Sequence, residues 1–151
     1  MVKIEYPAYH PKIKKEPDKE LIFDGLRKIW VVLTPEEWVR QNLLQYLVQV
    51  LKYPAKLIAV EKEIKIGELR KRFDIVVYDR QAMPRMIIEC KEMNVPLTPA
   101  VLNQVLRYNI PLQVNYLVIS NGSHCYAFEN KEGQLTELNT LPSFSSFGPA
   151  L

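Results

Sequence analysis

The alternation of apolar and polar positions along the chain predicts a series of short strands. Leu21–Leu33 holds two apolar runs around Asp24-Gly25, a dipeptide typical of hairpin turns. Five further segments are rich in β-branched or other apolar residues and are bounded by turn residues, which is typical of strands. These expected strands are Leu57–Ile66, Ile75–Tyr78, Met86–Ile88, Val114–Ser120 and Cys125–Phe128.

Two helices are expected, and each begins with a Thr-Pro pair. Thr34 supplies an N-cap hydroxyl, Pro35 suits the first helical position, and acidic residues follow where the helix dipole favours them. The apolar stripe of this helix continues to about Leu51. The pair Thr98-Pro99 opens a second helix that runs to about Asn109.

These elements predict one α/β or α+β domain with a central mixed β-sheet flanked by helices. Residues 1–19 contain three prolines among lysines and are expected to form an extended N-terminal arm. Residues 20–138 would form the domain itself. Residues 139–151 lack periodicity and are expected to be a C-terminal extension, either docked or loose.

The stretch RFDIVVYDRQAMPRMIIECK is the most informative part of the chain. Two apolar runs flank a polar turn, so it predicts an antiparallel hairpin in which Asp79 pairs with Pro84. Counting back through this register places Asp74 opposite Glu89, with the two side chains on the same face. Opposed like charges destabilise a sheet unless they are compensated, and a divalent cation could provide the compensation.

The residues after Glu89 extend this expectation. Strand alternation directs Lys91 to the same face as Glu89 and turns Cys90 toward the core. Cys90 and Cys125, the two cysteines of the chain, lie far apart in apolar strands and lack a CxxC spacing. We therefore expect both to be buried free thiols in a reducing compartment.

Composition and charge narrow the class of protein. The chain has 151 residues, of which 48% are hydrophobic and 25% are charged, as in an ordinary globular domain. It contains no apolar run of about 20 residues and no signal-peptide pattern, so we expect a cytoplasmic protein with no membrane association. The net charge of +3 does not by itself indicate whether the protein binds nucleic acid. However, the basic run Arg70–Arg72 adjoins Asp74 and is either a solvated edge or a contact for nucleic acid.

The spacing of Asp74 and Glu89-Cys90-Lys91 resembles the D…ExK signature of the PD-(D/E)xK nuclease superfamily. The segments TPEEWVRQ, RFDIVVYD, IIECKE, QVLRYN and LVISNG are similar, more narrowly, to the N-terminal nuclease domain of type I restriction enzyme R subunits. Phe73 stands where the name of the superfamily implies proline. The resemblance implies a restriction-endonuclease-like core and a Mg²⁺-dependent DNA endonuclease.

The resemblance also implies roles for individual residues. Asp74, Glu89 and the main-chain carbonyl of Cys90 would hold Mg²⁺, with Mn²⁺ as a substitute, and Lys91 would assist the attacking water. Magnesium prefers such hard oxygen ligands. Gln104 and Tyr108 resemble the QxxxY motif of some nucleases, and their spacing places them on one helix face.

Several of these residues could instead have purely structural roles. Gln104 and Tyr108 could simply pack against the domain or face water. The resemblance suggests Glu37 as a supporting acid from the first helix, but a capping box with Thr34 explains it equally well. Glu61 and Glu63 could support the site or lie exposed on their strand.

The implied partners are DNA and either other restriction-system subunits or a second copy of the chain, because no motif for base-specific readout is present. The alternative function is a noncatalytic nucleic-acid-binding or assembly module with a nuclease fold. A third interpretation is a structural protein in which the acids only pair with Arg70, Arg72 or Lys91.

Overall fold

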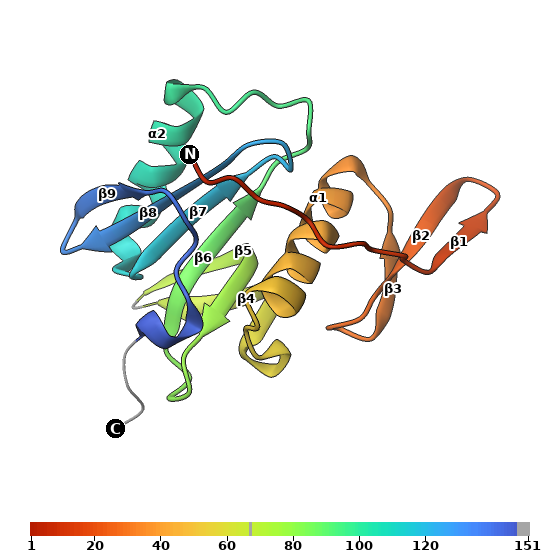
Figure 1. The fold of residues 1–151 in the computed structure, drawn as a ribbon, viewed down its shortest axis with the longest axis horizontal. Helices are drawn as coiled ribbons and strands as arrows, with labels where there is room; N and C mark the ends of the chain where they lie inside the picture. Colours follow the sequence, from red (N-terminus) through yellow and green to blue (C-terminus); the bar gives the residue numbers. More distant parts are fainter. Residues whose placement is uncertain (67, 148–151) are drawn as a thin grey trace.

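A six-stranded mixed sheet forms the centre of the computed structural model, which describes residues 1–66 and 68–147. The expected turn residue Gly67 and residues 148–151 of the C-terminal extension lie outside this description. The strands follow the chain in their order across the sheet (Figure 1), and they are β4 (Ile58–Ile66), β5 (Leu69–Tyr78), β6 (Pro84–Cys90), β7 (Tyr116–Ser120), β8 (Cys125–Lys131) and β9 (Gln134–Leu138).

Only β6 and β7 run parallel among the paired strands of this described sheet; the other neighbours are antiparallel. Parallel neighbours need a crossover connection, and α2 (Pro99–Asn109) lies in the segment that joins them. The predicted α/β fold with a mixed sheet is therefore confirmed.

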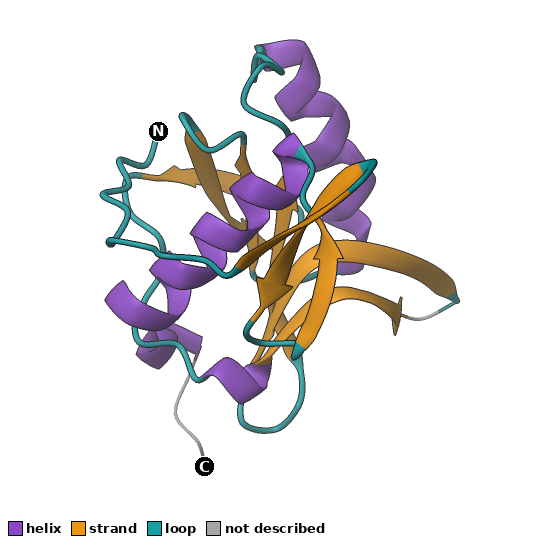
Figure 2. Ribbon diagram, turned by 90° about the vertical axis from the view of Figure 1, so that its right-hand side faces the viewer, coloured by secondary structure: helices purple, strands orange, loops and turns teal. Residues whose placement is uncertain are grey.

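Each face of the sheet buries a separate apolar core beneath one helix (Figure 2). On one face, α1 (Pro35–Gln45) packs Val39 and Leu43 against the sheet, and Leu47 follows just beyond the helix. On the other face, α2 contributes Leu106 to the second core. Burial on both faces explains why the central strands read as nearly continuous apolar runs.

Both helices begin where the sequence predicts. The hydroxyl of Thr34 accepts a hydrogen bond from Glu37 N at 3.0 Å, and that of Thr98 accepts one from Val101 N at 3.3 Å. After α1 the chain continues as a π-helical segment, so the helical region ends close to the expected Leu51. The short helical segments are Tyr46–Val50, Ala55–Leu57, Ile110–Leu112 and Phe144–Phe147. No helix in the described part of the chain is long and apolar enough to cross a membrane.

A second, three-stranded antiparallel sheet precedes α1 and consists of β1 (Ile13–Glu16), β2 (Lys19–Asp24) and β3 (Ile29–Val32). The hairpin predicted around Asp24-Gly25 is confirmed as β2 and β3. The expected extended arm, in contrast, does not continue through residues 13–19. Pro17 and Asp18 form a tight turn between β1 and β2, because the fixed φ of proline suits a turn position as well as an extended segment.

Strand β9 is an element that the apolar pattern does not predict. It pairs with β8 through a turn at Glu132 (φ 53°) and Gly133 (φ 86°). Glycine adopts such a left-handed conformation readily, whereas glutamate seldom does, so the turn has only half of the usual sequence signal. β9 is mostly exposed, which explains its weak apolar alternation.

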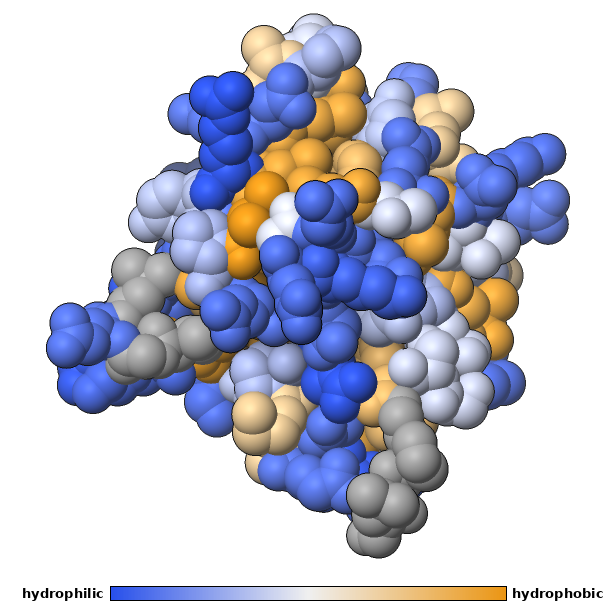
Figure 3. Space-filling view, turned by 90° about the vertical axis from the view of Figure 1, so that its left-hand side faces the viewer, coloured by the Kyte–Doolittle hydropathy of each residue, from blue (hydrophilic) through white to orange (hydrophobic). Residues whose placement is uncertain are grey.

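The two ends of the described chain close the core beneath α1. Val2 is buried and forms a β-bridge with Cys125, with Val2 N donating to Cys125 O at 2.8 Å. Near the other end, Phe147 is buried against the rings of Tyr53 and Tyr116. The C-terminal extension is thus docked as far as residue 147. The side of the molecule that carries α2 and the β8–β9 hairpin exposes hydrophobic residues between hydrophilic ones (Figure 3).

Candidate active site

The β5–β6 hairpin adopts the register predicted for its central part. Ile75 pairs with Ile88, and continuing the same count places Asp74 opposite Glu89. Near the turn the register shifts, and Pro84 pairs with Tyr78 instead of the predicted Asp79. This prediction was wrong because the Asp79 carboxylate closes the turn.

The side chain of Asp79 binds residues of the turn, and the main chain of Asp79 does not pair with a residue of β6. Its Oδ1 accepts hydrogen bonds from Gln81 N at 2.8 Å and Met83 N at 3.0 Å, and its Oδ2 accepts one from Arg85 at 3.1 Å. Aspartate side chains commonly stabilise turns in this way. The resulting β-bulge lies at the far end of the hairpin and leaves the pairing beside Asp74 unchanged.

The carboxylate of Asp74 is fixed from two sides. Its Oδ2 accepts a hydrogen bond from Cys90 N at 2.7 Å, which connects it to β6. Its Oδ1 accepts a hydrogen bond from Arg40 Nη2 at 2.7 Å, which connects it to α1. The Asp74 side chain is 12% exposed, so both charge-assisted bonds form largely away from water.

Glu89 lies close enough to Asp74 for the two charges to interact strongly. Burial raises the pKa of Glu89, and the negative charge of Asp74 raises it further, against an opposing effect of Lys71. The resulting pKa is about 7. Two neighbouring carboxylates that cannot easily ionise together are a common feature of functional sites.

Lys71 is the cation that directly contacts Glu89. Its Nζ lies 3.4 Å from Glu89 Oε1 and 3.2 Å from Asn109 Oδ1. It also lies 3.9 Å from the centre of the Tyr108 ring. The sequence placed Lys71 in a basic cluster beside Asp74 but gave no reason to select it over Arg70 or Arg72, both of which are exposed.

An irregularity in β5 explains why simple alternation does not identify Lys71. Phe73 and Val76 belong to the core beneath α2, whereas Ile75 belongs to the core beneath α1. A spacing of three between Phe73 and Val76 breaks the two-residue period of a strand. On β4, Glu61 has a left-handed φ of 48° at the same level, between the pairs Val60–Ile75 and Lys62–Phe73.

Glu89 and the predicted residues Lys91, Gln104 and Tyr108 line one cavity of about 300 Å³. Lys71 and Asn109 also line it. Lys91 thus lies beside Glu89 at this cavity. Cys90 turns away into the core beneath α1, where its side chain is buried, as predicted.

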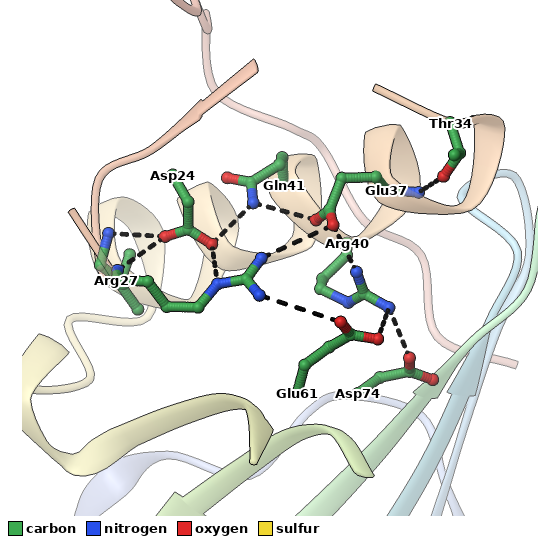
Figure 4. Close-up of polar contacts among 9 residues, drawn as sticks. Asp24, Arg27, Thr34, Glu37, Arg40, Gln41, Glu61 and Asp74 are labelled. Carbon is green, nitrogen blue, oxygen red and sulfur yellow. Dashed lines mark hydrogen bonds and ion pairs between the residues drawn. The ribbon is translucent and has the colours of Figure 1, made fainter. Parts of the chain in front are cut away.

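Arg40 connects Asp74 to the first helix, although no feature of the sequence assigned it a role. Its side chain is 4% exposed, and its guanidinium contacts Glu37 Oε1 at 2.6 Å and Glu61 Oε1 at 3.2 Å in addition to Asp74 (Figure 4). Burial lowers the pKa of Arg40, but the hydrogen bond to Asp74 and the surrounding carboxylates raise it more strongly. The i,i+3 spacing of Glu37 and Arg40 is the signal from which this pair could have been found.

Glu37 reaches Asp74 through Arg40. Its carboxylate also accepts a hydrogen bond from Gln41 at 3.1 Å and lies 3.5 Å from Arg27, so it is fully engaged with basic and amide groups. Only one half of the expected capping box forms, because Thr34 accepts from Glu37 N while the Glu37 side chain turns toward Arg40.

The neighbouring acids differ in their surroundings. Glu36 is more exposed than Glu37; burial raises its pKa, and the charge of Asp74 raises it further, whereas Arg40 and then Lys91 lower it. Of the two acids on β4, Glu61 joins the contacts around Arg40, and Glu63 is exposed. Glu36 therefore lies within electrostatic reach of Asp74 but outside the hydrogen-bonded contacts around Arg40.

The polar network continues from Arg40 to the three-stranded sheet (Figure 4). Asp24, at the end of β2, is fully buried and accepts hydrogen bonds from Arg27 Nε at 2.7 Å and Gln41 Nε2 at 2.9 Å. Burial raises the pKa of Asp24, but the hydrogen bonds from Arg27 and Gln41 hold it below its usual value. The sequence indicates for Asp24 only a position in a hairpin turn.

The oxygen atoms at this site suit a hard divalent cation, although few side chains supply them. No group of three or more His, Cys, Asp or Glu side chains that could hold a metal ion occurs among the described residues. Asp74 and Glu89 would be the side-chain ligands, with the main-chain carbonyl of Cys90 as a third protein oxygen. This donor set fits Mg²⁺, which keeps several water ligands.

Comparison with known families identifies the family to which the chain is related. Residues 35–142 match the family described as type I restriction enzyme R protein N terminus. The chain belongs to this family. The matched region includes α1, the six-stranded sheet and α2, and therefore Asp74, Glu89, Lys91, Gln104 and Tyr108. It begins after the three-stranded sheet.

A solved structure shares the fold of this family member. It is described as a "putative nuclease belonging to DUF820" from Anabaena variabilis ATCC 29413. The match has a TM-score of 0.51 at 10% sequence identity and covers 89% of this chain and 88% of the other. At this identity the similarity concerns the fold alone. No curated protein matches the sequence.

Proposed function

We propose that this chain is a Mg²⁺-dependent deoxyribonuclease of the restriction-enzyme type, which hydrolyses phosphodiester bonds at Asp74, Glu89 and Lys91. The observation that carries the proposal is the placement of Asp74 and Glu89 on adjacent strands, with Lys91 in the cavity beside Glu89. Membership of the type I restriction enzyme R protein family over residues 35–142 supports it.

Asp74, Glu89 and the main-chain carbonyl of Cys90 would hold the Mg²⁺ ion, and Mn²⁺ would substitute for it. The bound ion would polarise a phosphoryl oxygen and lower the pKa of a water molecule. The raised pKa of Glu89 supports this assignment, since a cation would relieve the repulsion between the two carboxylates.

The other residues of the cavity would position the substrate. Lys91 would orient the attacking water and offset negative charge as it develops on the phosphate. Gln104 would hydrogen-bond to a phosphate oxygen or to that water, with Tyr108 as support. Lys71 would offer a second positive charge to the phosphate once a metal ion has replaced it at Glu89.

Arg40 and Glu37 would act through Asp74 rather than on the substrate. Arg40 fixes one oxygen of the Asp74 carboxylate, and Glu37 holds Arg40 in place. The cleaved molecule would be DNA. Recognition of a particular sequence would depend on other restriction-system subunits or on a second copy of the chain.

The proposal is tested by incubating supercoiled and linear DNA with the protein in Mg²⁺, Mn²⁺ or EDTA. We expect cleavage only with metal, and a loss on the order of 10²-fold or more in Asp74→Asn, Glu89→Gln and Lys91→Met. The matched control is Glu63→Gln, which removes an exposed carboxylate from the neighbouring strand β4 and should cleave normally.

Calorimetric titration with Mn²⁺ separates the alternatives. The nuclease predicts Mn²⁺ binding that Asp74→Asn and Glu89→Gln weaken and Lys91→Met leaves largely intact. Metal-independent, salt-sensitive DNA binding without cleavage would instead indicate the noncatalytic module. Normal cleavage by both Asp74→Asn and Lys91→Met would contradict the mechanism.

A further inference from the structure

One face of the three-stranded sheet carries aromatic rings and lysines that the proposed cleavage site does not use. This sheet lies outside the region that matches the restriction-enzyme family. The register of its strands and the alternation of side chains define the face, which we call the aromatic face. Its principal residues are Lys12, Lys14, Lys19, Leu21, Phe23 and Trp30.

The aromatic face points toward solvent. Ile22 and Asp24, which alternate with its residues along β2, are fully buried, so the opposite face packs against the rest of the protein along β2, whereas Ile13 and Ile29 at its edges remain exposed. On the aromatic face, Trp30 is 40% exposed and Val32 is 45% exposed. The sheet extends from the side of α1, away from the β8–β9 edge of the large sheet (Figure 1).

The rings and the lysines are interleaved. The Phe23 and Trp30 rings meet edge to face with their centres 5.3 Å apart. Lys12 Nζ lies 5.7 Å from the centre of Phe23, and Lys14 Nζ lies 5.4 Å from the centre of Trp30. With Lys19, the face has three lysines, and Glu16 is its acidic residue.

We propose that the aromatic face binds single-stranded nucleic acid, with a base stacked on Trp30 and phosphates contacted by Lys12 and Lys14. Proteins that bind single strands combine stacking rings with cations that follow the backbone. Bases in a duplex are already stacked on one another, so an exposed ring favours an unpaired strand. A protein partner fits less well, because the cores of protein interfaces are depleted in lysine.

A chain of hydrogen bonds connects the three-stranded sheet, which carries the aromatic face, to the cleavage site. Asp24 at the end of β2 binds Arg27 and Gln41, Gln41 binds Glu37, and Glu37 binds Arg40, which holds Asp74. A strand bound to the sheet would therefore keep a fixed orientation relative to the site. Binding itself requires neither metal nor cleavage, so it can be tested separately.

Tryptophan fluorescence provides the test, since Trp30 and Trp38 are the two tryptophans of the chain. The full-length Trp38→Phe variant retains Trp30 alone and is titrated with oligo(dT) in EDTA at low salt. We expect its emission to be quenched as the oligonucleotide binds. Trp30→Phe retains Trp38 of α1, which stacks on Tyr9, and its emission should change little.

A pair of lysine variants tests the electrostatic part. Lys14→Gln should weaken oligo(dT) binding several-fold and reduce the slope of log K against log salt by about 0.7, the value for one phosphate contact on a single strand. The control is Lys131→Gln, whose side chain is 79% exposed at the end of β8. It should bind oligo(dT) as the parent does.

Three results would overturn the proposal: no binding of labelled oligo(dT), unchanged Trp30 emission despite binding measured by anisotropy, or equal losses in Lys14→Gln and Lys131→Gln. Circular dichroism of each variant checks that it is folded. Metal-dependent cleavage with an unresponsive Trp30 would reject this binding surface and retain the nuclease. Quenching of Trp30 without metal-dependent cleavage would retain this binding surface and reject the nuclease.

Discussion

Arg40 Nη2 donates a 2.7 Å hydrogen bond to Asp74 Oδ1 and thereby connects helix α1 to strand β5. The same guanidinium contacts Glu37 and Glu61, so one buried cation is shared by three carboxylates. The position of the Asp74 carboxylate therefore depends on α1 as well as on its own hairpin.

Replacing Arg40 with methionine should strongly destabilise the protein. Methionine replaces the aliphatic part of the arginine side chain but lacks the guanidinium, so Glu37 and Asp74 lose their buried partner. Removing one member of a buried ion pair typically costs about 3–5 kcal/mol in the free energy of unfolding. Urea denaturation monitored by circular dichroism measures the loss.

The control for this prediction is Arg72→Met, which removes an exposed arginine from β5. Exposed substitutions usually change stability by less than about 0.5 kcal/mol. An equal effect of the two substitutions would mean that the contacts of Arg40 contribute no more than those of a surface arginine.

Glu89 should make the stability of the metal-free protein fall between about pH 4.5 and pH 7. Its pKa rises from 4.5 to about 7 on folding because of burial, then because of the charge of Asp74. In this range the folded state binds a proton that the unfolded state has released, so the contribution of Glu89 is complete below pH 4.5 and is lost as pH rises toward 7.

The variant Glu89→Gln isolates this contribution, because glutamine does not titrate. Relative to the parent, its unfolding free energy should rise by up to about 3 kcal/mol as pH increases across the range. Urea unfolding at a series of pH values measures the difference. The exposed Glu63→Gln variant should show no such trend, and a flat profile for Glu89→Gln would refute the assignment.

Lys71→Met should strengthen Mn²⁺ binding several-fold at pH 8.5. Lys71 Nζ lies 3.4 Å from Glu89 Oε1, where its positive charge competes with a cation. The alkaline pH matters because loss of Lys71 also favours protonation of Glu89. Calorimetric titration provides the measurement, with exposed Lys56→Met as control. Unchanged or weaker binding in Lys71→Met would show that the lysine does not compete with the ion.

Both cysteines should be unreactive in the folded protein. Cys90 and Cys125 are free thiols with buried side chains. Burial raises the pKa of Cys125 to about 12 and that of Cys90 well above its usual value, so little reactive thiolate exists near neutral pH. A thiol-specific chromogenic reagent should therefore detect two thiols in urea and essentially none without it. Rapid labelling of the folded protein would contradict this prediction.

The hairpin register could be derived from sequence because it depends on local rules. Apolar runs on both sides of a turn determine which residues oppose each other, and this count correctly gave the pairs from Ile75–Ile88 to Val77–Met86, whose continuation places Asp74 across from Glu89. The count failed only at Tyr78 and Pro84, where the Asp79 side chain bonds to the turn. The helix starts could also be predicted from the sequence, because the hydroxyls of Thr34 and Thr98 accept hydrogen bonds from backbone N–H groups only three residues away.

The contacts of Lys71 and Arg40 depend on chain segments that are distant in sequence. Lys71 meets Asn109 and Tyr108 only after α2 has packed on the sheet, and a local break in the alternation of β5 hides its direction. Arg40 meets Asp74 only because α1 packs on the other face of that sheet. The periodic pattern of apolar residues along the chain does not indicate which of these distant segments come into contact.

By itself, the sequence determined the strands and helices around the site, the central register of the β5–β6 hairpin, and the burial of Cys90. Backbone geometry and side-chain periodicity act over a few residues and are therefore readable along the chain. The tertiary structure decided which cations accompany the carboxylates and raised the pKa of Glu89 to about 7. Burial and electrostatic interaction depend on the packing of all the elements, so only the complete fold specifies them.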